Sequence, residues 1–202
     1  DTLVLLGVLE IPLSKILVVS TERCGSTNFM KTLELIYNGK FWEHPIFNDF
    51  KSQVDNIGFK EFMDKSYQLS DFMGTKIVYK NNDMFIKEVI DYHDKVFLLV
   101  RNNLFEQVLS LHIANETNVY HKHTDQPVRK LNLYDLQKRV IANRKINDRL
   151  LNMVDKNSIL TYENIKHILV GEKVNTQYTQ IENINELNKH YKLNKEFYTY
   201  DY

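Results

Sequence analysis

The 202-residue chain has few of the residues that cross-link or interrupt a fold. Its single cysteine, Cys24, cannot form an internal disulfide. Six glycines and three prolines are too few for a linker, and no repeat or low-complexity tract divides the chain, so we predict a single domain over residues 1–202. Formal net charge is also lacking, because 26 basic side chains balance 26 acidic ones. This balance argues against a nucleic-acid-binding protein but allows a small anionic ligand.

Long apolar runs are absent as well. No run approaches the roughly 20 residues of a membrane-spanning helix. The apolar stretch at residues 3–9 is short and lacks the basic flank of a signal peptide. We therefore expect a cytoplasmic protein with no membrane partner, and no pattern indicates an oligomeric state.

Two unbroken apolar runs, residues 16–19 and 96–100, are typical of parallel strands that are buried on both faces. A short polar turn follows each run, and apolar residues at helical spacing follow each turn. Weaker patterns predict strands at residues 75–80 and 158–162, and helices at residues 133–154, 163–169 and 183–193. This alternation predicts an α/β fold, a central parallel sheet flanked by helices as a three-layer sandwich.

The turn at residues 20–28 carries the chemistry of an anion site. It lies at the carboxyl end of a predicted strand, where ligands bind in such sheets. Gly25 lets the backbone approach a ligand, and Arg23 adds a cation beside the unpaired N–H groups of a helix start. The Gly-x-x-x-x-Gly-Lys-Ser/Thr pattern of a Walker A loop is absent. An ordinary helix start capped by Ser26 is an equally good interpretation of this segment alone.

The second turn adds Arg101 at the end of its strand and Ser110 nine residues later in the following helix. An arginine in this place suits bidentate binding of a phosphate, and the serine hydroxyl is a second donor. Taken alone, the pair is more simply a surface arginine and a helix serine.

Together, residues 16–33 and 96–111 resemble the sulfotransferase family that uses 3′-phosphoadenosine 5′-phosphosulfate (PAPS). More narrowly, they are similar to bacterial and phage members related to carbohydrate sulfotransferases. Residues 74–78 resemble the family's strand with an embedded lysine, and residues 160–165 resemble its Tyr-Glu-Asp-Leu element. The resemblance spans about residues 15–180 and implies a fold like that of the P-loop nucleotide hydrolases.

This resemblance implies a site for PAPS as co-substrate, with 3′-phosphoadenosine 5′-phosphate (PAP) as product and no required metal. The first loop would hold the 5′-phosphosulfate, through Arg23, Cys24, Gly25, Ser26, Thr27 and Asn28. Arg101 and Ser110 would hold the 3′-phosphate, and Tyr162 would lie near the adenine. The family's late glycine-rich loop is not recognisable; Lys173 and Thr176 occupy that region and are the expected nucleotide contacts there.

The acceptor implied by the resemblance is a hydroxyl compound, by default a carbohydrate. The reaction needs a general base, and residues 39–47 resemble a stretch near the active site of carbohydrate-type members. Glu43 is the first candidate, His44 the second and Glu22 the third, although residues 43 and 44 fit a surface loop equally well. Arg23 is expected to act on the leaving group.

Several further features and functions remain open. His121 and His123 have no third ligand at suitable spacing, so no metal site is predicted. The basic side chains of residues 138–149 suggest a solvated helix face, and residues 197–202 a docking tail or an edge strand. The alternative functions are a nucleoside-triphosphate-dependent phosphotransferase with a degenerate phosphate loop, and a non-catalytic sulfotransferase-like binding module.

Overall fold

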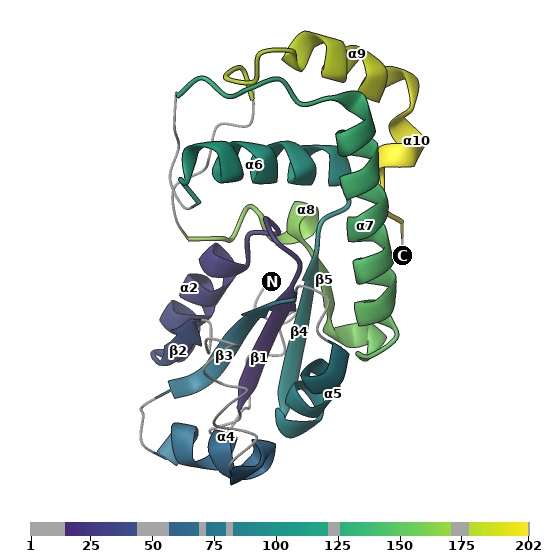
Figure 1. Cartoon of the computed structure of the whole chain (residues 1–202). Coiled ribbons are helices and arrows are strands. Elements are labelled where there is room, and N and C mark those ends of the chain that lie inside the picture. The colour runs from purple at the N-terminus through teal and green to yellow at the C-terminus, as the bar shows by residue number, and fades with distance from the viewer. Residues whose placement is uncertain are drawn as a thin grey trace.

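The computed structural model describes residues 15–43, 57–68, 72–79, 83–120, 126–170 and 178–201. It is an α/β fold in which helices flank a five-stranded, all-parallel sheet (Figure 1). The predicted fold class is therefore confirmed.

The strand order is β2-β3-β1-β4-β5. The central strand β1 (Ile16–Ser20) is completely buried and pairs on one side with β3 (Phe72–Val78) and on the other with β4 (Lys95–Val100). The edge strands are β2 (Lys40–Glu43), beside β3, and β5 (Ile159–Thr161), beside β4. The continuous apolar run of β1 follows from this position, because both of its faces are covered.

One face of the sheet is covered by α2 (Ser26–Tyr37) and the short α8 (Tyr162–Ile165). Val18 of β1 packs on this side with Phe29 and Leu33 of α2. These two residues are four positions apart, so they lie on one face of the helix.

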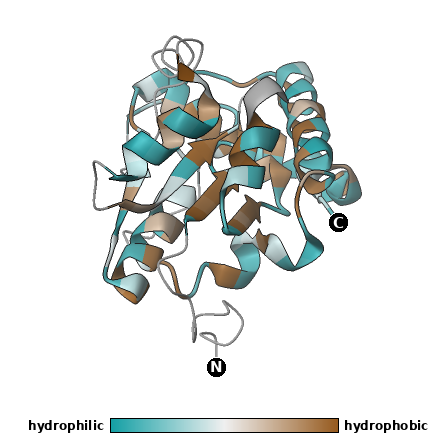
Figure 2. Ribbon diagram, turned by 90° about the horizontal axis from the view of Figure 1, so that it is seen from below, coloured by the Kyte–Doolittle hydropathy of each residue, from teal (hydrophilic) through white to brown (hydrophobic). Residues whose placement is uncertain are grey.

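The opposite face is covered by α5 (Asp83–Tyr92) and the last turns of α7 (Leu133–Leu151). Leu17 and Val19 of β1 pack on this side. α4 (Phe59–Gln68) forms a small separate cluster with Trp42. In the view from below, the hydrophobic ribbon is concentrated at the centre of the molecule (Figure 2).

A third cluster lies beyond the carboxyl ends of the strands. There α6 (Leu104–Thr117) runs across the end of the sheet and packs with α7, α9 (Ile184–Leu193) and α10 (Lys195–Tyr198) (Figure 1). This helical layer covers the turns that follow β1 and β4. Within the described parts of the chain, none of the helices combines the length and apolar character needed to cross a bilayer.

Several predicted elements have other bounds or roles. The long helix ends at Leu151, and the helix expected at residues 163–169 is reduced to α8. Residues 197–202 were predicted as a docking tail or an edge strand. In the described part, Tyr198 ends a helix, and Thr199 forms a single antiparallel β-bridge with Asn103, beside which Tyr200 donates its backbone N–H to the Asn102 carbonyl at 2.8 Å. Tyr198 and Tyr200 are buried, so this segment packs against the core and its strand pairing is limited to one bridge. On the predicted solvated face of α7, Lys138, Lys145 and Arg149 are exposed. Arg144 is half-buried, and its guanidinium donates to the backbone carbonyls of Phe197 and Thr199.

Candidate anion-binding site

The topology places a switch point between β1 and β4. From β1 the chain passes through α2 to the β3 side of the sheet, and from β4 it passes through α6 and α7 to the β5 side. Ligands of open parallel sheets bind where the connections that follow two adjacent strands lead to opposite sides of the sheet. Arg23 and Arg101 lie in the turns that follow these two strands.

The turn after β1 has a strained backbone and leads directly into α2. Arg23 and Gly25 both have positive φ, 62° and 77°. Gly25, not Ser26, is the N-cap residue of α2, and a glycine has no side chain that could cap the helix. The interpretation of this segment as a helix capped by Ser26 is therefore wrong. The first N–H groups of the helix have no partner within the helix itself, which suits an anion.

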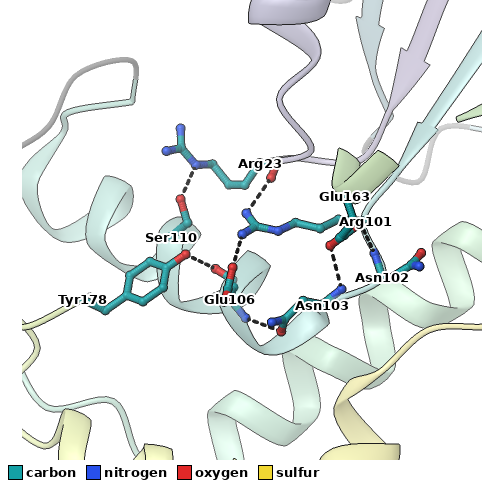
Figure 3. Close-up of polar contacts among 8 residues, drawn as sticks. All are labelled: Arg23, Arg101, Asn102, Asn103, Glu106, Ser110, Glu163 and Tyr178. Atoms are coloured by element: carbon teal, nitrogen blue, oxygen red, sulfur yellow. Dashed lines mark hydrogen bonds and ion pairs between the residues drawn. The ribbon is translucent and has the colours of Figure 1, made fainter. Parts of the chain in front are cut away.

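Arg23 extends from this turn towards α6. Its Nε donates to the Ser110 hydroxyl at 2.9 Å, and its Nη1 donates to the backbone carbonyl of Tyr120 (Figure 3). Both acceptors are neutral, and no carboxylate forms an ion pair with Arg23 in the parts of the chain that are described. Burial lowers the pKa of Arg23, and the nearby Arg101 cation lowers it further.

Arg101 lies underneath Arg23 and is only 5% exposed. Its Nη1 donates to the Arg23 backbone carbonyl at 3.3 Å, and its Nη2 pairs with Glu106 at 2.5 Å (Figure 3). Its Nε has no acceptor among the residues placed by the structure. Arg101 therefore connects the two turns directly.

The Tyr162 ring lies between the same two turns. The guanidinium carbon of Arg101 lies over its ring, 4.9 Å from the centroid. A Cβ atom added to Gly25 would be 2.8 Å from Cδ2 of this ring. Only a glycine leaves room for the ring, so the position of Tyr162 explains Gly25 in addition to its φ angle.

The turn after β4 is held by a carboxylate from α8. Glu163 accepts hydrogen bonds from the backbone N–H groups of Asn102 and Asn103, at 3.0 and 3.1 Å. Asn103 then caps α6, since its side chain accepts from the N–H of Glu106 at 3.1 Å. Two neighbouring residues of α8 thus surround Arg101: Tyr162 lies under its guanidinium, and Glu163 holds the turn that follows it (Figure 3 shows Glu163).

Cys24 faces the interior, away from any ligand that the turn would hold. Its thiol is completely buried, 3.1 Å from the Thr21 hydroxyl. Burial raises the pKa of Cys24 to about 11, so the thiol stays protonated at neutral pH. Only the backbone of Cys24 is therefore suited to contact an anion.

A buried lysine supports the start of α2 from the sheet. Lys76 of β3 is 1% exposed, and its Nζ donates to the Thr27 hydroxyl at 2.7 Å. Its register partner on β2 is Glu43, the last residue of that strand. The first candidate base thus belongs to the edge strand rather than to a loop, and its backbone neighbours this lysine.

Several of the expected site residues lie outside the described part of the chain. They are His44, Lys173, Thr176 and the side chain of Glu43, and the two histidines for which no metal site was predicted, His121 and His123, also lie outside it. The structure brings the others to the carboxyl ends of β1, β4 and β5.

Sequence reasoning missed five residues of the site: Lys76 (as a contact of Thr27), Glu106, Gln107, Glu163 and Tyr178. The Asn103-x-x-Glu106 spacing is a helix-start signal that identifies Glu106. Tyr178 donates to the Glu106 carbonyl at 3.2 Å, and burial raises its pKa to about 12. No pattern in the sequence indicates this contact.

Comparison with protein-family models and with curated proteins found no match to this chain.

Proposed function

We propose that this protein is a sulfotransferase that uses PAPS as its donor. The observation that carries the proposal is the contact between Arg101 and Arg23, which are 78 positions apart and meet beyond the carboxyl ends of β1 and β4. Arg101 pairs with Glu106, and Arg23 has no ion-pair partner among the described residues, so the two cations together favour an added anion.

The donor has two anionic ends, and the site has two matching sets of groups. The start of α2 and the Arg23 guanidinium suit the 5′-phosphosulfate, because both stabilise negative charge. Arg101 and Ser110 suit the 3′-phosphate, because a guanidinium and a hydroxyl both donate hydrogen bonds to phosphate. Both side chains also contact Arg23, which places them beside the first turn. Tyr162, stacked on Arg101, offers an aromatic face near the adenine.

In the proposed reaction, the bond between sulfur and the bridging phosphate oxygen breaks, and a new bond forms between sulfur and the acceptor oxygen. The products are a sulfate ester, PAP and the proton of the acceptor hydroxyl. Negative charge grows on the leaving phosphate, where Arg23 and the N–H groups at the start of α2 would stabilise it. Glu43, His44 and Glu22 are the candidate bases, and the acceptor is a hydroxyl compound, by resemblance a carbohydrate.

Calorimetry with PAP tests the donor assignment. We expect the wild-type protein to bind PAP and Arg23→Ala to weaken binding about 10- to 100-fold, as for the loss of a charge-assisted hydrogen bond. Arg129→Ala is the matched control, because its side chain is 90% exposed and should leave binding unchanged. Circular dichroism checks the fold of each variant.

Two outcomes would overturn the donor assignment: no binding of PAP at millimolar concentration, or equal binding by Arg23→Ala and wild type. A preference for ATP with Mg²⁺ would point to the phosphotransferase. PAP binding without turnover of PAPS over a broad panel of hydroxyl acceptors would point to the binding module.

A further inference from the structure

The first turn rests on a buried amide from another part of the chain. Gln107 of α6 is completely buried, and its Nε2 lies 2.9 Å from the Thr21 hydroxyl and 2.6 Å from the Glu22 carbonyl. The same nitrogen is 3.2 Å from the Cys24 sulfur. One side-chain amide therefore contacts three of the four residues that precede Gly25.

This amide meets a backbone that needs external support. Arg23 and Gly25 both adopt positive φ, and the arginine pays a steric cost there that glycine does not. Such a turn persists only if its surroundings hold it in place. Gln107 provides this support from the helix that begins three residues after Arg101, so it also couples the shapes of the two turns.

We propose that Gln107 is a positioning residue that holds residues 21–25 in the conformation that presents the start of α2 to an anion. Because its side chain is buried, it would act through the turn and not through contact with a ligand. The identity of the ligand rests on the proposed function, whereas the support of the turn does not.

Cys24 is the only cysteine of the chain and lies inside the supported turn, so its thiol reports on opening of the turn. The test variant is Gln107→Met, which keeps the volume of the side chain but removes the donor. Gln137→Met is the matched control, since Gln137 contacts His190 on the outer helices instead. Labelling with a thiol reagent at 25 °C measures the population of the open turn.

We expect Gln107→Met to be labelled about tenfold faster than wild type, as for the loss of about one net hydrogen bond, and Gln137→Met to behave as wild type. We also expect PAP to bind Gln107→Met about tenfold more weakly, at a temperature where circular dichroism shows the folded state. A purely structural role would lower the melting temperature but would not change this affinity. Thr21→Val removes one acceptor of the amide and should shift both readouts in the same direction, which keeps the test valid if Gln107→Met does not fold.

Labelling rates within twofold of wild type would overturn the inference, and so would faster labelling with unchanged PAP affinity. If the wild-type protein binds no PAP, the proposed function fails, and the labelling comparison alone then decides whether Gln107 holds the turn.

Discussion

Arg101 is the residue whose surroundings bear most directly on ligand binding. Glu106 occupies one edge of its guanidinium, with side-chain exposures of 6% for the arginine and 35% for the carboxylate. A phosphate that approaches Arg101 therefore competes with an internal carboxylate. This competition leads to a prediction with a definite sign.

We predict that Glu106→Gln destabilises the protein by about 1–3 kcal/mol, because it leaves a buried cation without its counter-ion; the partial exposure of Glu106 keeps the loss below that of a fully buried pair. PAP should then raise the melting temperature of the variant more than that of wild type, since a phosphate replaces the missing charge. Thermal melts with and without PAP measure both effects. An equal response to PAP in both proteins would contradict direct contact between Arg101 and the 3′-phosphate.

Glu61→Gln is the control for this experiment. It removes an exposed ion pair with Lys65, whose side chains are more than half exposed. Such pairs contribute about 0.5 kcal/mol or less, so stability and the PAP response should hardly change.

At the scale of elements, α8 places the Tyr162 ring against both turns. Its contact with Gly25 can be separated from backbone strain, because Gly58 also has positive φ, 82°, but a Cβ added there meets no atom within 4 Å. The two glycines therefore form a matched pair.

We predict that Gly58→Ala lowers the free energy of unfolding by about 1 kcal/mol, the cost of the left-handed backbone. Gly25→Ala should cost at least about twice as much, because the new methyl group also collides with the Tyr162 ring. Chemical denaturation measures both values. In a double-mutant cycle, Tyr162→Ala should remove the additional loss of stability caused by Gly25→Ala. Strictly additive free energies of unfolding would contradict the contact between residue 25 and the Tyr162 ring.

The same scale shows which elements a sequence can reveal. The β1 strand is evident from an apolar run, and α2 from the helical spacing of the apolar residues after the first turn. The sequence analysis does not predict α5, although Ile86, Val89 and Ile90 have helical spacing. β2 has four residues and lies at the sheet edge, so pairing with β3 defines it more than its own pattern does.

For the whole molecule, a buried histidine at the amino ends of the strands makes the free energy of unfolding depend on pH. His93 is 6% exposed; its Nδ1 faces the Val89 carbonyl at 2.6 Å, and its Nε2 faces the Tyr67 hydroxyl at 2.9 Å. Nδ1 therefore carries the proton, and Nε2 accepts from the tyrosine. Burial lowers the pKa of His93 from 6.5 to about 4.

The unfolded chain thus binds a proton below about pH 6.5 that the folded protein takes up only near pH 4. We predict that this histidine stabilises the fold fully above pH 6.5 and that its contribution is lost as the pH falls to about 4. The loss should be on the order of 2–3 kcal/mol. Denaturation series at both pH values would measure it.

His93→Gln should flatten this pH dependence, whereas His167→Gln, at an exposed position, should leave it unchanged. Carboxylates also titrate in this range, so the difference between His93→Gln and wild type isolates the histidine. If both proteins lose stability equally between pH 6.5 and 4, the buried neutral histidine is not the cause.

The sequence alone determined the parallel α/β character, the buried strands β1 and β4, and the places of Arg23 and Arg101 in the turns after them. These features are local, since each depends on the side-chain period of a few consecutive residues. Only the tertiary structure decided that the two turns are neighbours, because strand order depends on how helices cover the sheet.

The tertiary structure also selected the groups that support the turns. Gln107 lies 86 positions from Thr21, and Glu163 lies 61 positions from Asn102. A buried amide or carboxylate takes whichever partner folding brings to it, and no sequence period records that partner. The anion-binding chemistry is thus visible in short motifs, whereas the means of holding it in shape exist only in the folded chain.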